Sequence, residues 1–212
     1  MEKIKSLLKI ETIVSKPDID GELRNIANIL MNEYCISNGE YIYRPIEIEF
    51  YVYDKDKHAD IHVYPRDQKE AGELFFHLSG MDICLKSSLE DGRFGGILIR
   101  ALEREKKGDE PNKLFGGPLT CVNEILNTAK NHNDIQVVVY CNNSSHSANC
   151  IGKRKGINQY KTHTDEYWDK EYRFLRDDFN LGDEISMKDD TFDFKLHSIK
   201  KDRIRKYKII ND

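Results

Sequence analysis

The sequence lacks any apolar run that approaches the roughly 18 residues needed for a membrane-spanning helix. Its opening segment, MEKIKSLLKIETIV, is also too charged and too amphipathic to be a secretory signal. We therefore expect no membrane association and a cytoplasmic location.

Cysteines are few, and they are not arranged as ligand pairs. The five cysteines are an odd number, and none forms a CxxC motif, so we expect reduced thiols and no disulfide framework. The most crowded stretch, CNNSSHSANC (141–150), is more loosely spaced than the paired ligands of zinc sites. We interpret it as a polar loop and expect no bound metal.

An excess of positive charge is also missing. The net charge of −4 argues against a protein that coats nucleic acid through bulk electrostatics. Two basic stretches, GKRKG (152–156) and KKDRIRKYK (200–208), are interpreted as solvated surface. No glycine-rich phosphate loop follows a predicted strand, so no nucleotide cofactor is expected.

The pattern of elements predicts one α+β domain over residues 1–212, with 178–212 as a possible peripheral extension, because helices come first and antiparallel-looking strands follow. Asp20 is the expected N-cap of the second helix. The predicted helices span 2–14, 20–34 and 116–131, with a short helix or turn at 66–72 and a long loop at 142–170. The predicted strands span 41–53, 58–64, 73–79, 82–87, 96–103, 135–141 and 171–177, with short ones possible at TFDFKLHSI and KYKII.

Three segments, IEIEFYVY (46–53), HADIHVY (58–64) and ELFFHL (73–78), alternate apolar residues with titratable or aromatic ones. Side chains alternate between the faces of a strand, so the second set can face away from the core as the floor of a reaction pocket. That set is Glu49, Tyr51, His58, Asp60, His62 and His77. Arg100 lies inside the apolar run GGILIRALE (95–103), where a guanidinium is costly to bury unless a carboxylate or another acceptor meets it.

Four segments in this order resemble the alkyladenine (3-methyladenine) DNA glycosylase family along most of the chain. They are IEIEFY (46–51), GELFFHLSGMDICL (72–85), GGILIRALE (95–103) and LFGGPLTCVNEIL (114–126). The resemblance implies a curved, mostly antiparallel sheet with flanking helices, similar to the formyltransferase C-terminal-domain-like fold. It also implies a monofunctional glycosylase of base excision repair, which flips a damaged or alkylated purine out of DNA and hydrolyses its N-glycosidic bond without a cofactor.

The resemblance also implies roles for individual residues. Glu49 falls on the catalytic glutamate that activates water, and Arg100 on the arginine that helps to hold this water. Tyr51 falls on an aromatic residue that stacks on the extruded base, with His77 in the place of the opposing tyrosine. The pocket histidine of the family matches neither His58 nor His62 by spacing, and both stay candidates.

Two positions depart from the family pattern. Ser79 stands where the family inserts a tyrosine into the duplex, and serine cannot fill the gap left by a flipped nucleotide. Lys86 replaces a pocket asparagine, so selectivity differs or the pocket serves another ligand. Single-stranded DNA or a free nucleoside therefore remains a possible substrate beside duplex DNA.

Other interpretations stay open from sequence alone. The chain can be a non-catalytic module that binds a nucleobase or another planar ligand, in which Arg100 forms a structural ion pair with Glu47 or Glu103. His58, Asp60 and His62 share one face if 58–64 is a strand, and with a further ligand such as His77 or Glu49 they could hold the metal of a hydrolase.

Overall fold

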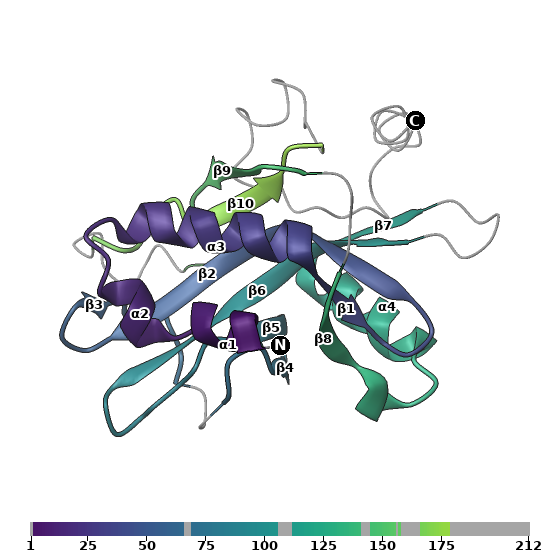
Figure 1. Ribbon diagram of the computed structural model, residues 1–212, viewed down its shortest axis with the longest axis horizontal. Coiled ribbons are helices and arrows are strands. Elements are labelled where there is room, and N and C mark those ends of the chain that lie inside the picture. The colour runs from purple at the N-terminus through teal and green to yellow at the C-terminus, as the bar shows by residue number, and fades with distance from the viewer. Residues whose placement is uncertain are drawn as a thin grey trace.

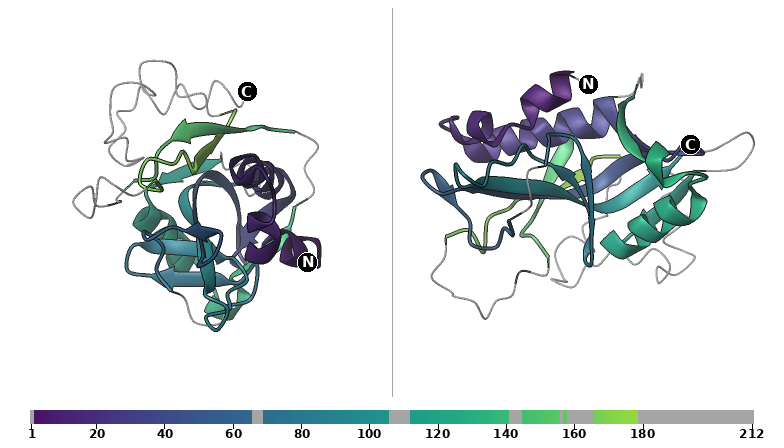
Figure 2. Two further views of the ribbon diagram at one scale, coloured as in Figure 1. Left: turned by 90° about the vertical axis from the view of Figure 1, so that its left-hand side faces the viewer. Right: turned by 90° about the horizontal axis from the view of Figure 1, so that it is seen from below.

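The computed structural model describes residues 2–65, 69–105, 112–140, 145–155, 157 and 166–178. These residues form an α+β structure around one sheet of ten strands that curls strongly (Figures 1 and 2). Every pair of strands within it is antiparallel. The strands predicted at TFDFKLHSI and KYKII, like the basic stretch 200–208, lie outside the described residues.

Two long strands, β2 (Ile42–Asp54) and β6 (Arg93–Arg104), form the centre of the sheet and pair along most of their length. The shorter strands extend the sheet from both of them (Figure 1). On the free side of β2 lie β1 (Tyr34–Ser37), β10 (Arg173–Arg176) and β3 (His58–Ala59), while β8 (Gln136–Val139) pairs with β1 and β9 (Ala148–Gly152) with β10. On the side of β6 lie β5 (Gly80–Cys84), β4 (Leu74–His77) and β7 (Lys113–Gly116).

The helices lie on both faces of this sheet. Helices α1 (Glu2–Leu7), α2 (Ile10–Val14) and α3 (Ile19–Glu33) cover one face, and α4 (Pro118–Thr128) packs on the other (Figure 2). A short 3-10 helix, η1 (His132–Asp134), follows α4. None of the helices within the described ranges is both long and apolar enough to cross a membrane.

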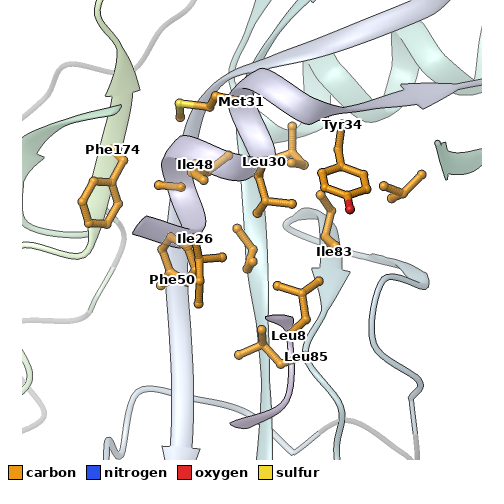
Figure 3. Packing of buried hydrophobic residues seen from close by; sticks show 14 of the residues in the cluster. Leu8, Ile26, Leu30, Met31, Tyr34, Ile48, Phe50, Ile83, Leu85 and Phe174 are labelled. Carbon is orange, nitrogen blue, oxygen red and sulfur yellow. The ribbon is translucent and has the colours of Figure 1, made fainter. Parts of the chain in front are cut away.

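Most of the core lies between the sheet and the first three helices, and Cys121, Val122 and Ile125 of α4 belong to the same cluster. Ile26 and Leu30 of α3 point onto Ile48 and Phe50 of β2, and Leu8 lies beside Leu85 (Figure 3). Each of these side chains is fully buried, and burial of one such aliphatic or aromatic side chain contributes about 1.5–3 kcal/mol. Ile48, Phe50 and Val52 all face this core, which turns the residues between them to the opposite face of the sheet.

The predicted α+β class and the curved antiparallel sheet are confirmed, while several boundaries were wrong. The predicted helix 2–14 is interrupted after Leu7, because Lys86 donates its backbone N–H to the carbonyl of Leu8 and ties the chain to the sheet. The N-cap of α3 is Asp18, which accepts a hydrogen bond from Gly21 at 2.8 Å, and not Asp20. Strands β1, β7 and β9 were not predicted, and the predicted strand 58–64 is reduced to β3.

Candidate functional site

Glu49 and Tyr51 share the face of β2 that points away from the first three helices, as the alternation predicted. They are joined by a hydrogen bond of 3.1 Å from the Tyr51 hydroxyl to Glu49 Oε2. The side chain of Glu49 is 0% exposed, so this face is not the open floor that the sequence suggested. Glu49 is instead a carboxylate held inside a polar cluster.

Arg100 reaches this cluster from β6. Its NH1 lies 3.3 Å from Glu49 Oε2, and its Nε donates to Glu47 Oε1 at 3.1 Å. The pairing register shifts where Glu47 meets β6, which is typical of a β-bulge, a feature that re-aims a side chain. Of the two structural partners considered for Arg100, Glu47 is confirmed, whereas Glu103 binds Arg176 and Arg44 instead.

A second arginine and a backbone amide complete the surroundings of Glu49. Arg173 of β10 is the cross-strand neighbour of Glu49, and its Nε donates to Glu47 Oε1 at 2.5 Å. The backbone N–H of Lys155 donates to Glu49 Oε1 at 2.7 Å. The carboxylate therefore accepts donors on both oxygens, from β2, β6 and the segment that follows β9.

The electrostatics of Glu49 combine two opposing effects. Burial disfavours the charged form and raises the pKa of Glu49 above its ordinary value, while the Arg100 guanidinium and the Lys155 N–H act in the opposite direction. The pKa of the Tyr51 hydroxyl is raised well above the usual range, chiefly by burial and next by the Glu49 carboxylate. Tyr51 is therefore a neutral donor, and Glu49 is a carboxylate that gains a proton more readily than an exposed one.

The basic stretch 152–156 was interpreted as solvated surface, and this was wrong for Arg154. Its side chain is fully buried and binds Asp60 Oδ2 at 2.5 Å, the carbonyl of Phe50 at 3.2 Å and that of Tyr167 at 2.9 Å. The guanidinium carbon also lies 4.9 Å from the centre of the Tyr51 ring. Arg154 therefore covers one side of the aromatic residue predicted to stack on a base.

Neither candidate pocket histidine contacts Glu49 or Tyr51 in the described structure. His58 is buried with its ring 4.5 Å from that of Tyr167, and burial lowers its pKa. His62 lies in a turn after β3, where its backbone N–H donates to Asp60 Oδ1 at 3.0 Å. The premise that His58, Asp60 and His62 share one strand face is wrong, because the strand ends at Ala59 and the Asp60 carboxylate binds Arg154.

His77 lies at the end of the β4–β5 hairpin, opposite Gly80, whereas Tyr51 is in line with Gly96 and Cys84. Gly80 and Cys84 are four residues apart on β5, about 13 Å along an extended strand. The structure therefore does not bring Tyr51 and His77 together as two walls of one slot.

His77 instead has partners within its own hairpin. Its Nδ1 accepts the backbone N–H of Ser79 at 3.3 Å, and its Nε2 lies 3.3 Å from the buried carboxylate of Asp82. The ring of Phe75 stacks on His77 with the two ring centres 5.7 Å apart.

The other two predicted substrate contacts are also apart from Glu49. Lys86 follows β5, with its half-exposed amino group 3.7 Å from Glu70. Ser79 lies in the tight turn of the β4–β5 hairpin, beside Leu78, whose side chain is 97% exposed. Gly80 adopts φ +152°, and a Cβ there would lie 2.6 Å from Pro118, so the hairpin tip packs directly on the start of α4.

Sequence reasoning missed three side chains of the cluster: Glu47, Arg154 and Arg173. Arg173 stands in the apolar context EYRFL, which is the same signal that identified Arg100, and it could have been found in that way. Glu47 is the first acid of the Glu-x-Glu pair and was considered only as a structural partner. Arg154 carried no signal, because a buried arginine in a lysine-rich loop cannot be distinguished from a surface one.

Metal ligands gather at a different place. Within the described ranges, His146, Asp177 and Asp178 are the one set of three such residues with ligand atoms within 4.8 Å of one another. The two ring nitrogens of His146 face different carboxylates, at 3.5 and 3.7 Å, and Asp178 also accepts from Arg176 at 2.6 Å. This arrangement is that of a histidine clamped between two acids.

In comparisons with known proteins, no family model and no curated protein matches the chain.

Proposed function

We propose that this protein hydrolyses the N-glycosidic bond of a damaged or alkylated purine in DNA, with Glu49 as the base that activates water. The observation that carries the proposal is the convergence of Arg100 NH1 and the Tyr51 hydroxyl on one oxygen of Glu49, at 3.3 and 3.1 Å. These groups come from different strands and meet in a buried position, where a carboxylate and a guanidinium are costly unless they are paired.

The chemistry uses few groups. The oxygen of a water molecule attacks the sugar carbon C1′, the C–N bond breaks with its electron pair leaving on the base, and Glu49 accepts the proton of the water. The sugar passes through a state with oxocarbenium character, which an adjacent carboxylate stabilises. Both oxygens of Glu49 already accept donors, Oε1 from the Lys155 N–H and Oε2 from Tyr51 and Arg100, so the attacking water would share one of these oxygens, with the Arg100 guanidinium beside it as a donor for its oxygen.

We also propose that the chain is a member of the alkyladenine glycosylase family, with the formyltransferase C-terminal-domain-like fold. The observed order of elements supports this: three N-terminal helices, a curled antiparallel sheet, and Glu49 and Arg100 on its two central strands. Tyr51 would stack on the base with the ring face opposite Arg154.

The proposed partner is DNA, and Leu78 is the residue that would enter it. Ser79 cannot fill the place of an extruded nucleotide, but its neighbour Leu78 is an almost fully exposed apolar side chain at the tip of a tight hairpin. Leucine is one of the apolar wedges that proteins insert between base steps. Gly80 lets this tip pack closely on Pro118, so the start of α4 supports the wedge from below.

The proposal is tested with an oligonucleotide that carries one labelled alkylated or deaminated purine, single-stranded or in a duplex, under single-turnover conditions. Wild type should release the base, and Glu49→Gln should slow release by about 10²–10⁴-fold, the usual contribution of a general base, without weakening binding. Glu90→Gln is the matched control, because Glu90 is an exposed acid in the turn between β5 and β6.

Three outcomes would contradict the proposal. Binding of the oligonucleotide with no release of base would indicate a non-catalytic module. Equal loss in Glu49→Gln and Glu90→Gln would remove the special role of Glu49. Loss of activity in chelator, restored by added zinc, manganese or iron, would indicate a metal hydrolase.

A further inference from the structure

Glu47 is the second buried acid of the cluster, and it has no direct place in the hydrolysis proposed above. Its Oε1 accepts two arginines at once, Arg100 Nε at 3.1 Å and Arg173 Nε at 2.5 Å. Its side chain is fully buried. Arg100 is thus shared between two carboxylates, with its Nε on Glu47 and its NH1 on Glu49.

We propose that Glu47 is a positioning residue, which holds Arg100 by its Nε edge so that a single N–H of the guanidinium reaches Glu49. This inference rests on the proposed function, in which Glu49 is the general base. It assigns to Glu47 an effect on the strength of that base, exerted through Arg100 and without contact to the substrate.

The geometry of a guanidinium gives the reason. Arginine presents its N–H groups as a planar fork that matches both oxygens of a carboxylate, and such bidentate pairs are the strong ones. A bidentate pair between Arg100 and Glu49 would stabilise the charged carboxylate and make it a weaker base. By occupying Nε, Glu47 divides the fork and leaves Glu49 with one contact, at 3.3 Å.

The negative charge of Glu47 shifts the pKa of Glu49 in the same direction as the contact between Glu47 and Arg100. The negative charge of Glu47 raises the pKa of Glu49, whereas Arg100 and Arg173 lower it. Removal of Glu47 therefore lowers the pKa of Glu49 for two reasons. The repulsion between the two carboxylates is lost, and Arg100 is released from Glu47 and can bind Glu49 more closely. The groups that face Glu49 and Glu47 from the packed elements are Tyr51, Arg100, Arg173, Cys121 and the Lys155 backbone.

One atom of Glu47 argues against a purely structural role. Within the described structure its Oε2 is buried and accepts no hydrogen bond, although its other oxygen accepts two. A buried acceptor without a partner costs about 1–3 kcal/mol. If Glu47 served only as a structural ion pair, a side chain without this unpaired oxygen would stabilise the protein more. A role of Glu47 that needs its charge and its contact with Arg100 explains why the unpaired oxygen is present.

The test compares Glu47→Gln with Glu103→Gln. Glu103 is a matched control because it is also a buried acid between two arginines, Arg176 at 2.5 Å and Arg44 at 3.8 Å, outside the Glu49 cluster. The primary measurement is the NMR titration of the Glu49 side-chain carboxyl carbon, assigned by comparison with Glu49→Gln. The second is the pH dependence of single-turnover base release.

In Glu47→Gln, the midpoint of the Glu49 titration should move to lower pH, and the acid limb of the rate profile should move with it. The rate at pH 8 should fall about tenfold, far less than after loss of the base itself, with KM unchanged. Glu103→Gln should shift neither the midpoint of the Glu49 titration nor the acid limb of the rate profile. An unmoved midpoint in Glu47→Gln, or an equal shift in Glu103→Gln, would overturn the inference.

Failure of the proposed function gives a different result. If wild type releases no base, the hydrolase proposal is wrong, and the NMR titration still decides the coupling of Glu47 to Glu49. If circular dichroism shows that Glu47→Gln does not fold, Glu47→Asp replaces it. The shorter acid retracts from Arg100, so the midpoint should move in the same direction by a smaller amount, and an unmoved midpoint there also overturns the inference.

Discussion

Replacement of Arg154 by methionine should be among the most destabilising single changes in this protein. Arg154→Met removes the cation from buried Asp60 and the donors from the carbonyls of Phe50 and Tyr167. Methionine keeps much of the shape of the side chain, so the effect isolates the lost charge and hydrogen bonds.

The magnitude follows from the burial of both partners. The side chains of Arg154 and Asp60 are each 0% exposed, and removal of one partner from such a pair costs about 3–5 kcal/mol because the other stays buried and charged. This is a large share of the roughly 5–15 kcal/mol that stabilises an ordinary domain. We expect Arg154→Met to lower the free energy of unfolding by about 4 kcal/mol at pH 7.

A second substitution, Asp60→Asn, distinguishes the effect of the unpaired buried charge from a general loss of packing. In the double variant, no uncompensated charge remains in the core, so the loss should be smaller than the sum of the two single losses by about 1–3 kcal/mol. Urea unfolding can be followed by the fluorescence of Trp168, the single tryptophan, and by circular dichroism. A loss below about 1 kcal/mol in Arg154→Met, or strict additivity in the double variant, would refute the reasoning.

Further predictions concern the hairpin, one histidine, the thiols and the core. Leu78→Ser should slow base release from duplex DNA about tenfold and leave single-stranded substrate unaffected in the same assay, because only a duplex has a gap to fill. Burial lowers the pKa of His58 in the folded protein. The stability that the neutral side chain contributes is therefore present above the pKa of about 6.5 in the unfolded chain, and it is lost as the pH falls through the lower pKa of the folded protein. His58→Phe should flatten this part of the curve of unfolding free energy against pH. Burial raises the pKa of Cys35 to about 12, so its native thiol should resist alkylation, as peptide mapping with and without urea can show. Leu30→Ala should cost about 2–5 kcal/mol in urea unfolding, because Leu30 is fully buried between α3 and the sheet.

The sequence predicted those parts of the fold that depend on local periodicity. Alternation placed Glu49 and Tyr51 on one face of β2, and the arginine within an apolar run predicted that Arg100 has an acceptor as its partner, which the structure shows to be a carboxylate. Strands β7 and β9 were missed because they are short, so their stability comes from the partner strands β6 and β10 and not from their own composition.

The parts of the site that were wrong depend on tertiary placement. His77 was paired with Tyr51 from the family pattern, but the position of a residue along a hairpin depends on strand register, which composition does not specify. The burial of Arg154 depends on where the segment after β9 crosses β2, a contact between residues about one hundred positions apart.

Strand β10 has a consequence for the order in which this chain can assemble. Arg173 and Arg176, three residues apart, supply cations to Glu47 and Glu103, which precede them by 126 and 73 residues. A growing chain thus presents each acid with one arginine, Arg100 for Glu47 and Arg44 for Glu103, long before the second arginine exists, so burial of the two central strands costs more in the meantime. A fragment that stops before Tyr172 should remain loosely packed, which makes late addition of one four-residue strand the step that commits the molecule to its native state.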